Sequence, residues 1–309
     1  LPAPGETVGD ASFMQSLGGK GANQAVAAAR LGGSVIFVTS LGNDMYADIL
    51  KKNFEKEGIT TDYIINDNQH PTGTALIFVA DSGENCIAVA PGANYSLSPE
   101  SINHFSKVID ETEIVVMQAE IPYNTIKSIA LLAQQKGKKV LFNPAPACLI
   151  DAELMKAIDI LVVNEVEAAF VSGIKHTGDN LEEIAEALIT AGAQNVVITL
   201  GSHGVYMKNA YTSGRLPSYK VNAIDTIAAG DTFCGALAVM CAQKEIDIEA
   251  LKFANAAAAI AVTRSGAQPS IPTLEEVNHF ILKNELPYRS TSKFNEHENL
   301  LEPTIHSIR

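Results

Sequence analysis

The chain has 309 residues, of which 47% are hydrophobic, so it can bury a substantial core as one large or two small domains. Its net charge is −13, from 22 Lys and Arg against 35 Asp and Glu, and without a basic stripe this excludes nucleic acid as an expected partner. We expect neither a signal peptide nor a membrane span, because no apolar stretch reaches the roughly 18 residues that a membrane helix needs.

From residue 34 onward, short apolar runs alternate with helical patterns. Strands are predicted within 34–42, 113–118, 138–143, 159–164 and 195–201, the last closing the series, and helices near 44–57, 122–136, 151–157 and 165–172. Nearly continuous apolar strands between helices favour an α/β fold in which helices cover both faces of a mostly parallel sheet.

Two regions depart from this alternation. Residues 72–90 read as a β-hairpin, which could form a small projecting sheet together with the opening segment 1–8, and a sheet beside an α/β crevice suggests a lid. After residue 231 the pattern is helical, near 231–244, 248–263 and 274–284. We therefore predict one domain over 1–286, with lid segments near 1–17 and 71–90, and a polar, disordered tail over 287–309.

The cysteines and histidines suggest no metal site. Cys86, Cys148, Cys234 and Cys241 form no Cys-x-x-Cys pair, and we interpret them as reduced core residues of a cytosolic protein. The seven histidines show no ligand spacing, so we expect them at the surface or in loops and consider a zinc enzyme improbable.

The stretch "AIDTIAAGDTFCGALAV" (223–239) is the strongest candidate for chemistry. Ala228, Ala229 and Gly230 are small enough for an oxygen-rich ligand to approach the main chain, and a helix starting near Asp231 adds partial positive charge. Asp231 could then accept a proton from an attacking hydroxyl. The alternative from this stretch alone is that Asp231 only caps the helix.

Three further segments carry polar groups that could serve a site. In "NEVE", Asn164 and Glu167 follow a strand and could orient magnesium-bound water and phosphate, or could simply form a capping box. In "GGKGANQ" (18–24), Lys20 and Asn23 could bind sugar hydroxyls, or the turn could only start a tightly packed helix. Glu120 could pair with hydroxyls or be a surface acid. Neither a Walker A loop nor a Gly-x-Gly-x-x-Gly turn after a strand is present.

Taken together, these segments resemble the ribokinase branch of the PfkB family of carbohydrate kinases. The resemblance runs in order from Leu1 to about Pro272. It is carried by nine stretches: "GGKGANQAVAAARLG", "TGTALIFV", "PGAN", "QAEIP", "NPAPA", "NEVEA", "TLGSHGV", "DTIAAGDTFCGALA" and "AAAAIAVTRSGAQPSIP". It implies ATP-dependent phosphorylation of D-ribose at its primary 5-hydroxyl. The alternatives are a kinase for deoxyribose or another small sugar or nucleoside, and a binding protein without catalysis.

The resemblance also assigns roles to individual residues. Asp231 would be the catalytic base, and Ala228, Ala229 and Gly230 the anion hole. The sugar would be bound by Gly19, Lys20, Gly21, Ala22, Asn23, Glu120 and Asp231, and covered by Ala75, Ile77 and Val89 of the lid. ATP and magnesium would lie along Asn164, Glu167, Thr199, Leu200, Gly201, Ser202, His203, Gly204, Gly230, Asp231 and Asn255. Potassium would be held by Asp225, Ile227, Ala261, Arg264, Gly266 and Ser270, mostly through backbone carbonyls.

Two further expectations follow from the resemblance. The family's lid commonly pairs with a partner's lid, so we expect a homodimer. The strand that opens the family and ends in a Gly-Ser-x-Asn-x-Asp pattern is not seen before Leu1. We therefore expect the chain to be a fragment of a longer protein that is more stable and more active.

Overall fold

The structure is a computed structural model that describes residues 5–9, 12–80 and 85–284. The predicted tail over 287–309 lies outside the described residues. The strands are β1 (Thr39–Gly42), β2 (Ile64–Asp67), β3 (Thr74–Val79), β4 (Asn85–Ala90), β5 (Ile114–Gln118), β6 (Lys139–Asn143), β7 (Ile160–Asn164), β8 (Asn195–Thr199), β9 (Val205–Asn209) and β10 (Ser213–Leu216). The α-helices are α1 (Lys20–Arg30), α2 (Met45–Lys56), α3 (Pro99–Asp110), α4 (Tyr123–Gln135), α5 (Ala152–Lys156), α6 (Glu165–Ser172), α7 (Leu181–Ala191), α8 (Ala229–Cys241), α9 (Ile248–Ala261) and α10 (Leu274–Lys283).

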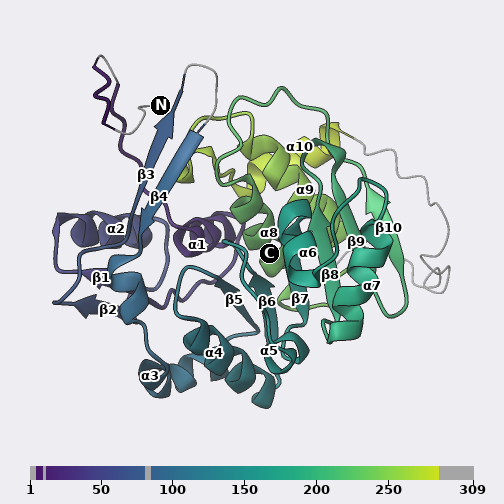
Figure 1. Cartoon of the computed structure of the whole chain (residues 1–309), viewed down its shortest axis with the longest axis horizontal. Coiled ribbons are helices and arrows are strands. Elements are labelled where there is room, and N and C mark those ends of the chain that lie inside the picture. The colour runs from purple at the N-terminus through teal and green to yellow at the C-terminus, as the bar shows by residue number, and fades with distance from the viewer. Residues whose placement is uncertain (1–4, 10–11, 81–84, 285–309) are drawn as a thin grey trace, which may run out of the picture.

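The largest sheet confirms the predicted α/β architecture (Figure 1). Its order is β10-β9-β8-β7-β6-β5, and β5 to β8 are parallel. Successive residues of β7 enter different cores: Ile160 and Val162 pack with α8 and α9, whereas Leu161 and Val163 pack with α5 and α7. Helices thus cover both faces of the sheet. The series does not close at 195–201 as predicted, because β9 and β10 continue it in antiparallel order.

Strands β1 and β2 form a separate two-stranded parallel sheet. Of the predicted strand over 34–42, only Thr39–Gly42 is regular, preceded by an isolated bridge between Ile36 and Thr60. A third small core joins α1 to this region through Val26, Ala27 and Phe54.

Helix α1 approaches α8 very closely. A Cβ placed on Gly235 of α8 would lie 2.6 Å from the Cβ of Ala27 and 2.7 Å from the carbonyl oxygen of Gln24. Since real Cβ atoms do not come this close, only glycine allows the contact. The approach places the first turns of α1 and α8, which carry the candidate residues, beside each other.

The predicted hairpin is present as antiparallel β3 and β4, which project from the body (Figure 1). The predicted contribution of the opening segment to this sheet is wrong for the described residues, since 5–9 and 12–17 contain no strand. Leu76, Ile77 and Val79 are exposed, as is Cys86, so the prediction that all cysteines are core residues is also wrong. Cys86 is exposed because it lies on β4 of this hairpin, whose described side chains are exposed to solvent. None of the described helices is long and apolar enough to cross a membrane.

Candidate active site

The N-terminus of α8 forms an open cradle of main-chain groups. Its N-cap is Ala228, at φ 60° and ψ 8°, and no side chain caps the helix. The N–H of Ala229 donates to the carbonyl of Thr226 at 3.3 Å, whereas those of Gly230 and Asp231 donate to no described residue. These two groups are available to a ligand, together with the positive end of the helix dipole. A Cβ placed on Gly230 would meet nothing within 4 Å, so the cradle faces open space.

Asp231 is buried at the third position of α8 and does not act as its N-cap. Its Oδ2 accepts a hydrogen bond from Nδ2 of Asn23 at 2.9 Å, and its Oδ1 accepts one from Nε2 of Gln24 at 3.1 Å. The structure thus contradicts the capping interpretation. It holds the carboxylate by side chains of α1, more than 200 residues away along the chain.

The sequence analysis missed three amide side chains: Gln24, which contacts Asp231, and two residues that contact Gln24. Nε2 of Gln24 also donates to Oδ1 of Asn143 at 3.2 Å, and Nε2 of Gln118 donates to Oε1 of Gln24 at 2.7 Å. Asn143 in turn donates to the carbonyl oxygen of Val162. Gln24, Gln118 and Asn143 all lie in stretches that carry the family resemblance. Gln118 and Asn143 end the neighbouring strands β5 and β6, where a parallel sheet delivers site residues, and this position was the available signal.

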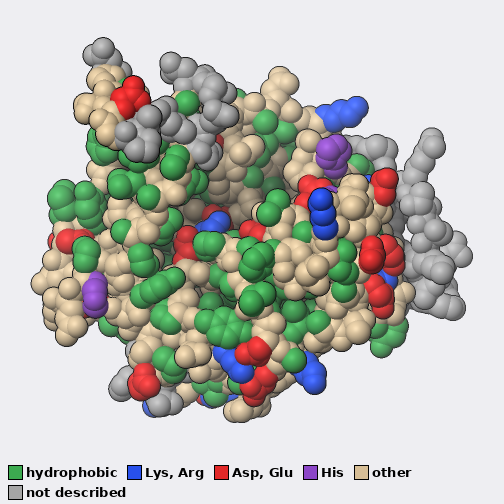
Figure 2. All heavy atoms as spheres, in the orientation of Figure 1, with side chains coloured by type: hydrophobic (Ala, Val, Ile, Leu, Met, Phe, Trp, Pro, Cys, Tyr) green, Lys and Arg blue, Asp and Glu red, His purple; other side chains and the backbone are tan. Residues whose placement is uncertain are grey.

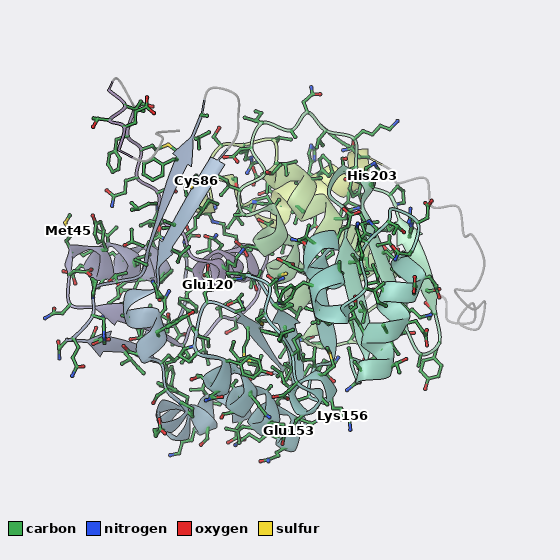
Figure 3. All side chains as sticks on the ribbon, viewed as in Figure 1. Met45, Cys86, Glu120, Glu153, Lys156 and His203 are labelled. Carbon is green, nitrogen blue, oxygen red and sulfur yellow. The ribbon has the colours of Figure 1, made fainter. Side chains whose placement is uncertain are left out.

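Lys20 and Glu120 join the start of α1 to the segment just after β5. The backbone N–H of Lys20 donates to Oε2 of Glu120 at 2.8 Å. Figure 3 shows Glu120 in the middle of the molecule, near α1. Burial raises the pKa of Glu120, opposed by the N–H and charge of Lys20 and reinforced by the charge of Asp231. Glu120 is therefore not the plain surface acid of the alternative interpretation.

Asn164 and Glu167 form the capping box that the sequence allowed. Oδ1 of Asn164 accepts from the N–H of Glu167, and Oε2 of Glu167 accepts from the N–H of Asn164. Burial raises the pKa of Glu167, which the charge of Lys20 lowers and the charge of Asp231 raises further. The capping box and a ligand role are compatible, because Oε1 of Glu167 makes no hydrogen bond to a described residue.

The charged side chains of these segments therefore form one cluster. Lys20 and Asp231 act electrostatically on both Glu120 and Glu167. Figure 2 shows the molecule hollowed at its centre, with acidic and basic side chains at the floor of the hollow. With one cation and three carboxylates, the cluster of Lys20, Glu120, Glu167 and Asp231 suits a ligand that brings hydroxyl donors or a cation.

The other predicted nucleotide residues lie in two structural settings. Leu200 to Gly204 form a tight turn after β8, in which the N–H of Leu200 donates to the carbonyl of Gly204 at 2.8 Å. Nδ2 of Asn255 donates to the carbonyl of Pro217 at 2.8 Å, so this buried side chain braces the loop that leads toward α8.

The predicted cation segments are joined through Asp225. Its Oδ1 accepts from the N–H of Ile227 at 2.9 Å, and its Oδ2 accepts from the N–H of Gly266 at 2.8 Å. By contrast, Arg264 points its guanidinium to Glu276, so only its main chain could serve a cation. A surface hollow of about 590 Å³ adjoins these segments and is lined by Lys220, Val221, Asn222, Ile224 and Thr263. The described residues contain no group of three or more His, Cys, Asp or Glu that could hold a metal.

Comparisons with known proteins give a consistent result. The sequence pattern described as pfkB family carbohydrate kinase matches residues 2–274. The ribokinase of Haemophilus influenzae is 40% identical, over 90% of this chain and 91% of its own. The deoxyribokinase of Salmonella typhi is 36% identical, over 92% of this chain and 94% of its own. A solved structure of Arabidopsis thaliana ribokinase complexed with ribose and ATP superimposes with a TM-score of 0.85 at 30% identity, over 91% of this chain and 92% of that one.

Proposed function

We propose, since this chain belongs to the pfkB family of carbohydrate kinases, that it transfers the terminal phosphoryl group of ATP to the 5-hydroxyl of D-ribose. The observation that carries the proposal is the buried carboxylate of Asp231, held by Asn23 and Gln24 beside the uncapped N-terminus of α8. A base and an anion cradle side by side are what phosphoryl transfer to a hydroxyl needs.

In this reaction the sugar oxygen attacks the γ-phosphorus while its proton passes to Asp231. A bond forms between the sugar oxygen and phosphorus, the bond from phosphorus to the bridging oxygen of ADP breaks, and ADP leaves. The first-turn N–H groups of Gly230 and Asp231, which donate to no described residue, would face the negative charge that develops on the phosphoryl oxygens. Each oxygen of Asp231 accepts one hydrogen bond, which leaves it a lone pair for the proton.

The sugar side of the site has a buried hydrogen-bond acceptor that is unpaired among the described residues. Oδ1 of Asn23 is buried and has no hydrogen-bond partner among the described residues, while its Nδ2 is used by Asp231. A buried acceptor left unpaired costs about 1–3 kcal/mol. A sugar hydroxyl that donates to Oδ1 would remove this cost, and Glu120 offers a second acceptor nearby.

The nucleotide would lie on the other side of Asp231, along the NEVE segment and the turn over Thr199–Gly204. Magnesium fits here through oxygen ligands, because Oε1 of Glu167 is unengaged among the described residues. When bound, magnesium would offset the charge of the phosphate groups. The chain itself supplies the half-buried carboxylate of Glu167, whose pKa burial raises.

Potassium fits the segments that Asp225 joins. Both oxygens of Asp225 are taken by backbone N–H groups, so this residue fixes the two segments next to each other. The carbonyl oxygens of Ile227, Arg264 and Gly266 accept no hydrogen bond from the described residues. Neutral carbonyls of this kind suit a large monovalent cation better than a small divalent one.

The hairpin supports a homodimer in which two lids pair. Ile77 and Ile87 stand opposite each other in the register, Ala75 faces Val89, and Ile77, Ile87 and Val89 are all about half exposed. Apolar side chains on an uncovered hairpin are stabilised by burial against a second copy. We also place the protein in the cytosol, where the exposed thiol of Cys86 stays reduced.

A coupled ADP-release assay with ribose, 2-deoxyribose, fructose and adenosine tests the proposal. We expect ribose to give the highest kcat/KM, with ATP consumption that requires the sugar. Higher kcat/KM with 2-deoxyribose would favour the second candidate, which the similarity to a deoxyribokinase supports. Binding of ribose and ATP without ADP release would instead identify a protein that has lost catalysis.

A further inference from the structure

The amide side chains behind Asp231 form a chain with one consistent direction. The carbonyl of Val162 can only accept a hydrogen bond, so Asn143 turns its Nδ2 toward it, at 2.8 Å. The Oδ1 of Asn143 then faces Gln24 and must receive a donor, which is Nε2 of Gln24. The orientation of Asn143 is therefore fixed by the main chain of β7.

Gln24 is in turn fixed from three sides. Its two N–H groups are used by two acceptors, Oδ1 of Asn143 and Oδ1 of Asp231, and its Oε1 accepts from Gln118. If the amide were reversed, its oxygen would face those two acceptors and its NH₂ would face the NH₂ of Gln118. Three repulsive contacts would replace three hydrogen bonds, so one orientation is strongly preferred.

The network is buried and spans four elements. Gln24, Asn143 and Asp231 are all buried, on α1, β6 and α8, and Gln118 adds the end of β5. Low local polarity strengthens these hydrogen bonds and makes their loss costly. A carboxylate on such a network cannot rotate without breaking it.

Asp231 needs this restraint because the last torsion of an aspartate side chain has a broad energy minimum. Asn23 holds one oxygen, but in the proposed function Asn23 also receives the sugar and can move with it. Gln24 holds the other oxygen and makes all its hydrogen bonds to protein groups. The plane of the carboxylate is thus set from the protein side.

We propose that Gln24, supported by Asn143 and Gln118, is a positioning residue that holds the carboxylate of Asp231 in its reactive orientation. The kinetic consequence of this inference rests on the proposed function, whereas the hydrogen-bond network itself can be measured without substrate. A misplacement of about 1 Å at a reacting group can cost on the order of 10²-fold in rate.

The kinetic test compares Gln24→Met with Gln194→Met. Gln194 is a matched control, because its Nε2 also donates to an aspartate, Oδ1 of Asp159, at 2.9 Å on the exposed surface. We expect Gln24→Met to lower kcat about 10- to 100-fold with KM for ribose and ATP changed less than threefold, and Gln194→Met to match the parent. Asn143→Leu and Gln118→Met should give smaller losses of kcat than Gln24→Met, since both residues act on Asp231 only through Gln24.

A double-mutant cycle separates positioning from a general structural effect. If Gln24 acts through the carboxylate, adding Gln24→Met to Asp231→Asn should change the residual turnover less than threefold. If the substitution lowers turnover by the same factor in both backgrounds, or if Gln24→Met alone keeps the parent kcat, the proposal is wrong.

A substrate-free measurement decides the geometry even if the protein phosphorylates no sugar. In ¹⁵N-labelled protein, the side-chain NH₂ of Gln24, assigned by its absence from Gln24→Met, should exchange with solvent at least tenfold more slowly than that of Gln194. Asp231→Ala should speed the exchange at Gln24 and leave Gln194 unchanged. Equal exchange rates at both positions in the parent would overturn the proposal that the buried network holds Gln24. A parent protein without turnover but with a protected Gln24 would overturn only the proposed function.

Discussion

Arg30 stabilises the junction of three segments, and replacing it by Met should measurably destabilise the protein. Its guanidinium donates to both carboxylate oxygens of Glu57, at 2.8 and 2.6 Å, and to the carbonyls of Gln268 and Ile271, each at 2.8 Å. The side chains of Arg30 and Glu57 are 23% and 14% exposed. Met keeps most of the apolar stem but none of the four hydrogen bonds.

The expected loss lies between the values for exposed and buried ion pairs. Exposed pairs are worth about 0–1 kcal/mol, and breaking a buried pair costs about 3–5 kcal/mol. For a mostly buried, bidentate pair with two more bonds to carbonyls we expect Arg30→Met to lower the free energy of unfolding by about 2–4 kcal/mol. Lys127→Met is the control, because Lys127 pairs with two exposed carboxylates and should cost less than about 1 kcal/mol.

Urea unfolding at neutral and acidic pH measures both the loss and its cause. The hydrogen bond from Arg30 lowers the pKa of Glu57 below its ordinary 4.5, so this pair contributes stability that is fully present above 4.5. That contribution is lost as pH falls through the lowered pKa. The difference between parent and Arg30→Met should therefore shrink as pH falls below 4.5. Equal losses for Arg30→Met and Lys127→Met at pH 7 would refute the reasoning.

Three other predictions concern the cradle, the cation and the lid. Ala228→Gly should leave the free energy of unfolding in urea unchanged or raise it by up to about 1.5 kcal/mol. The left-handed conformation costs alanine about 1–2 kcal/mol, whereas glycine loses about 0.5–1 kcal/mol more chain entropy on folding. A loss of stability above about 1 kcal/mol would contradict this prediction. Sugar-dependent ATP turnover should rise when potassium replaces sodium or lithium, and equal rates in all three salts would remove the proposed cation site. Ile77→Asp should shift a parent dimer to monomer in sedimentation velocity, whereas an unchanged sedimentation coefficient would show that the lids do not pair.

The sequence predicted most of the parallel sheet and its helices, because these depend on local patterns. The apolar runs predicted within 113–118 and 159–164 became β5 and β7, each beginning one residue later, and the helix predicted near 165–172 has those bounds in the structure. The antiparallel β9 and β10 were missed because their burial is set by the neighbouring strand β8. The exposure of Cys86 was missed for a related reason: an apolar neighbourhood in sequence does not show whether a hairpin is covered.

The site was predictable in its type but not in its internal contacts. Small residues before Asp231 indicated the cradle, and the structure places them at the N-terminus of α8. The contacts of Asp231 with Asn23 and Gln24 join positions more than 200 residues apart, which no local pattern encodes. The NEVE segment shows the reverse case, in which the capping box is visible in the sequence and forms in the structure, while its role toward a nucleotide stays a prediction.

The central claim, that Asp231 serves as the base of a ribose kinase, is tested most directly by measuring ribose-dependent ADP release from the parent and from Asp231→Asn side by side, with ATP affinity measured on the same samples. Asparagine keeps the size of the side chain and the small-residue cradle but accepts a proton poorly. We expect turnover to fall roughly 10²-fold or more while the Kd for ATP changes less than about threefold. A variant that releases ADP within threefold of the parent rate would contradict the account, because the buried carboxylate would then serve only the packing of α1 against α8.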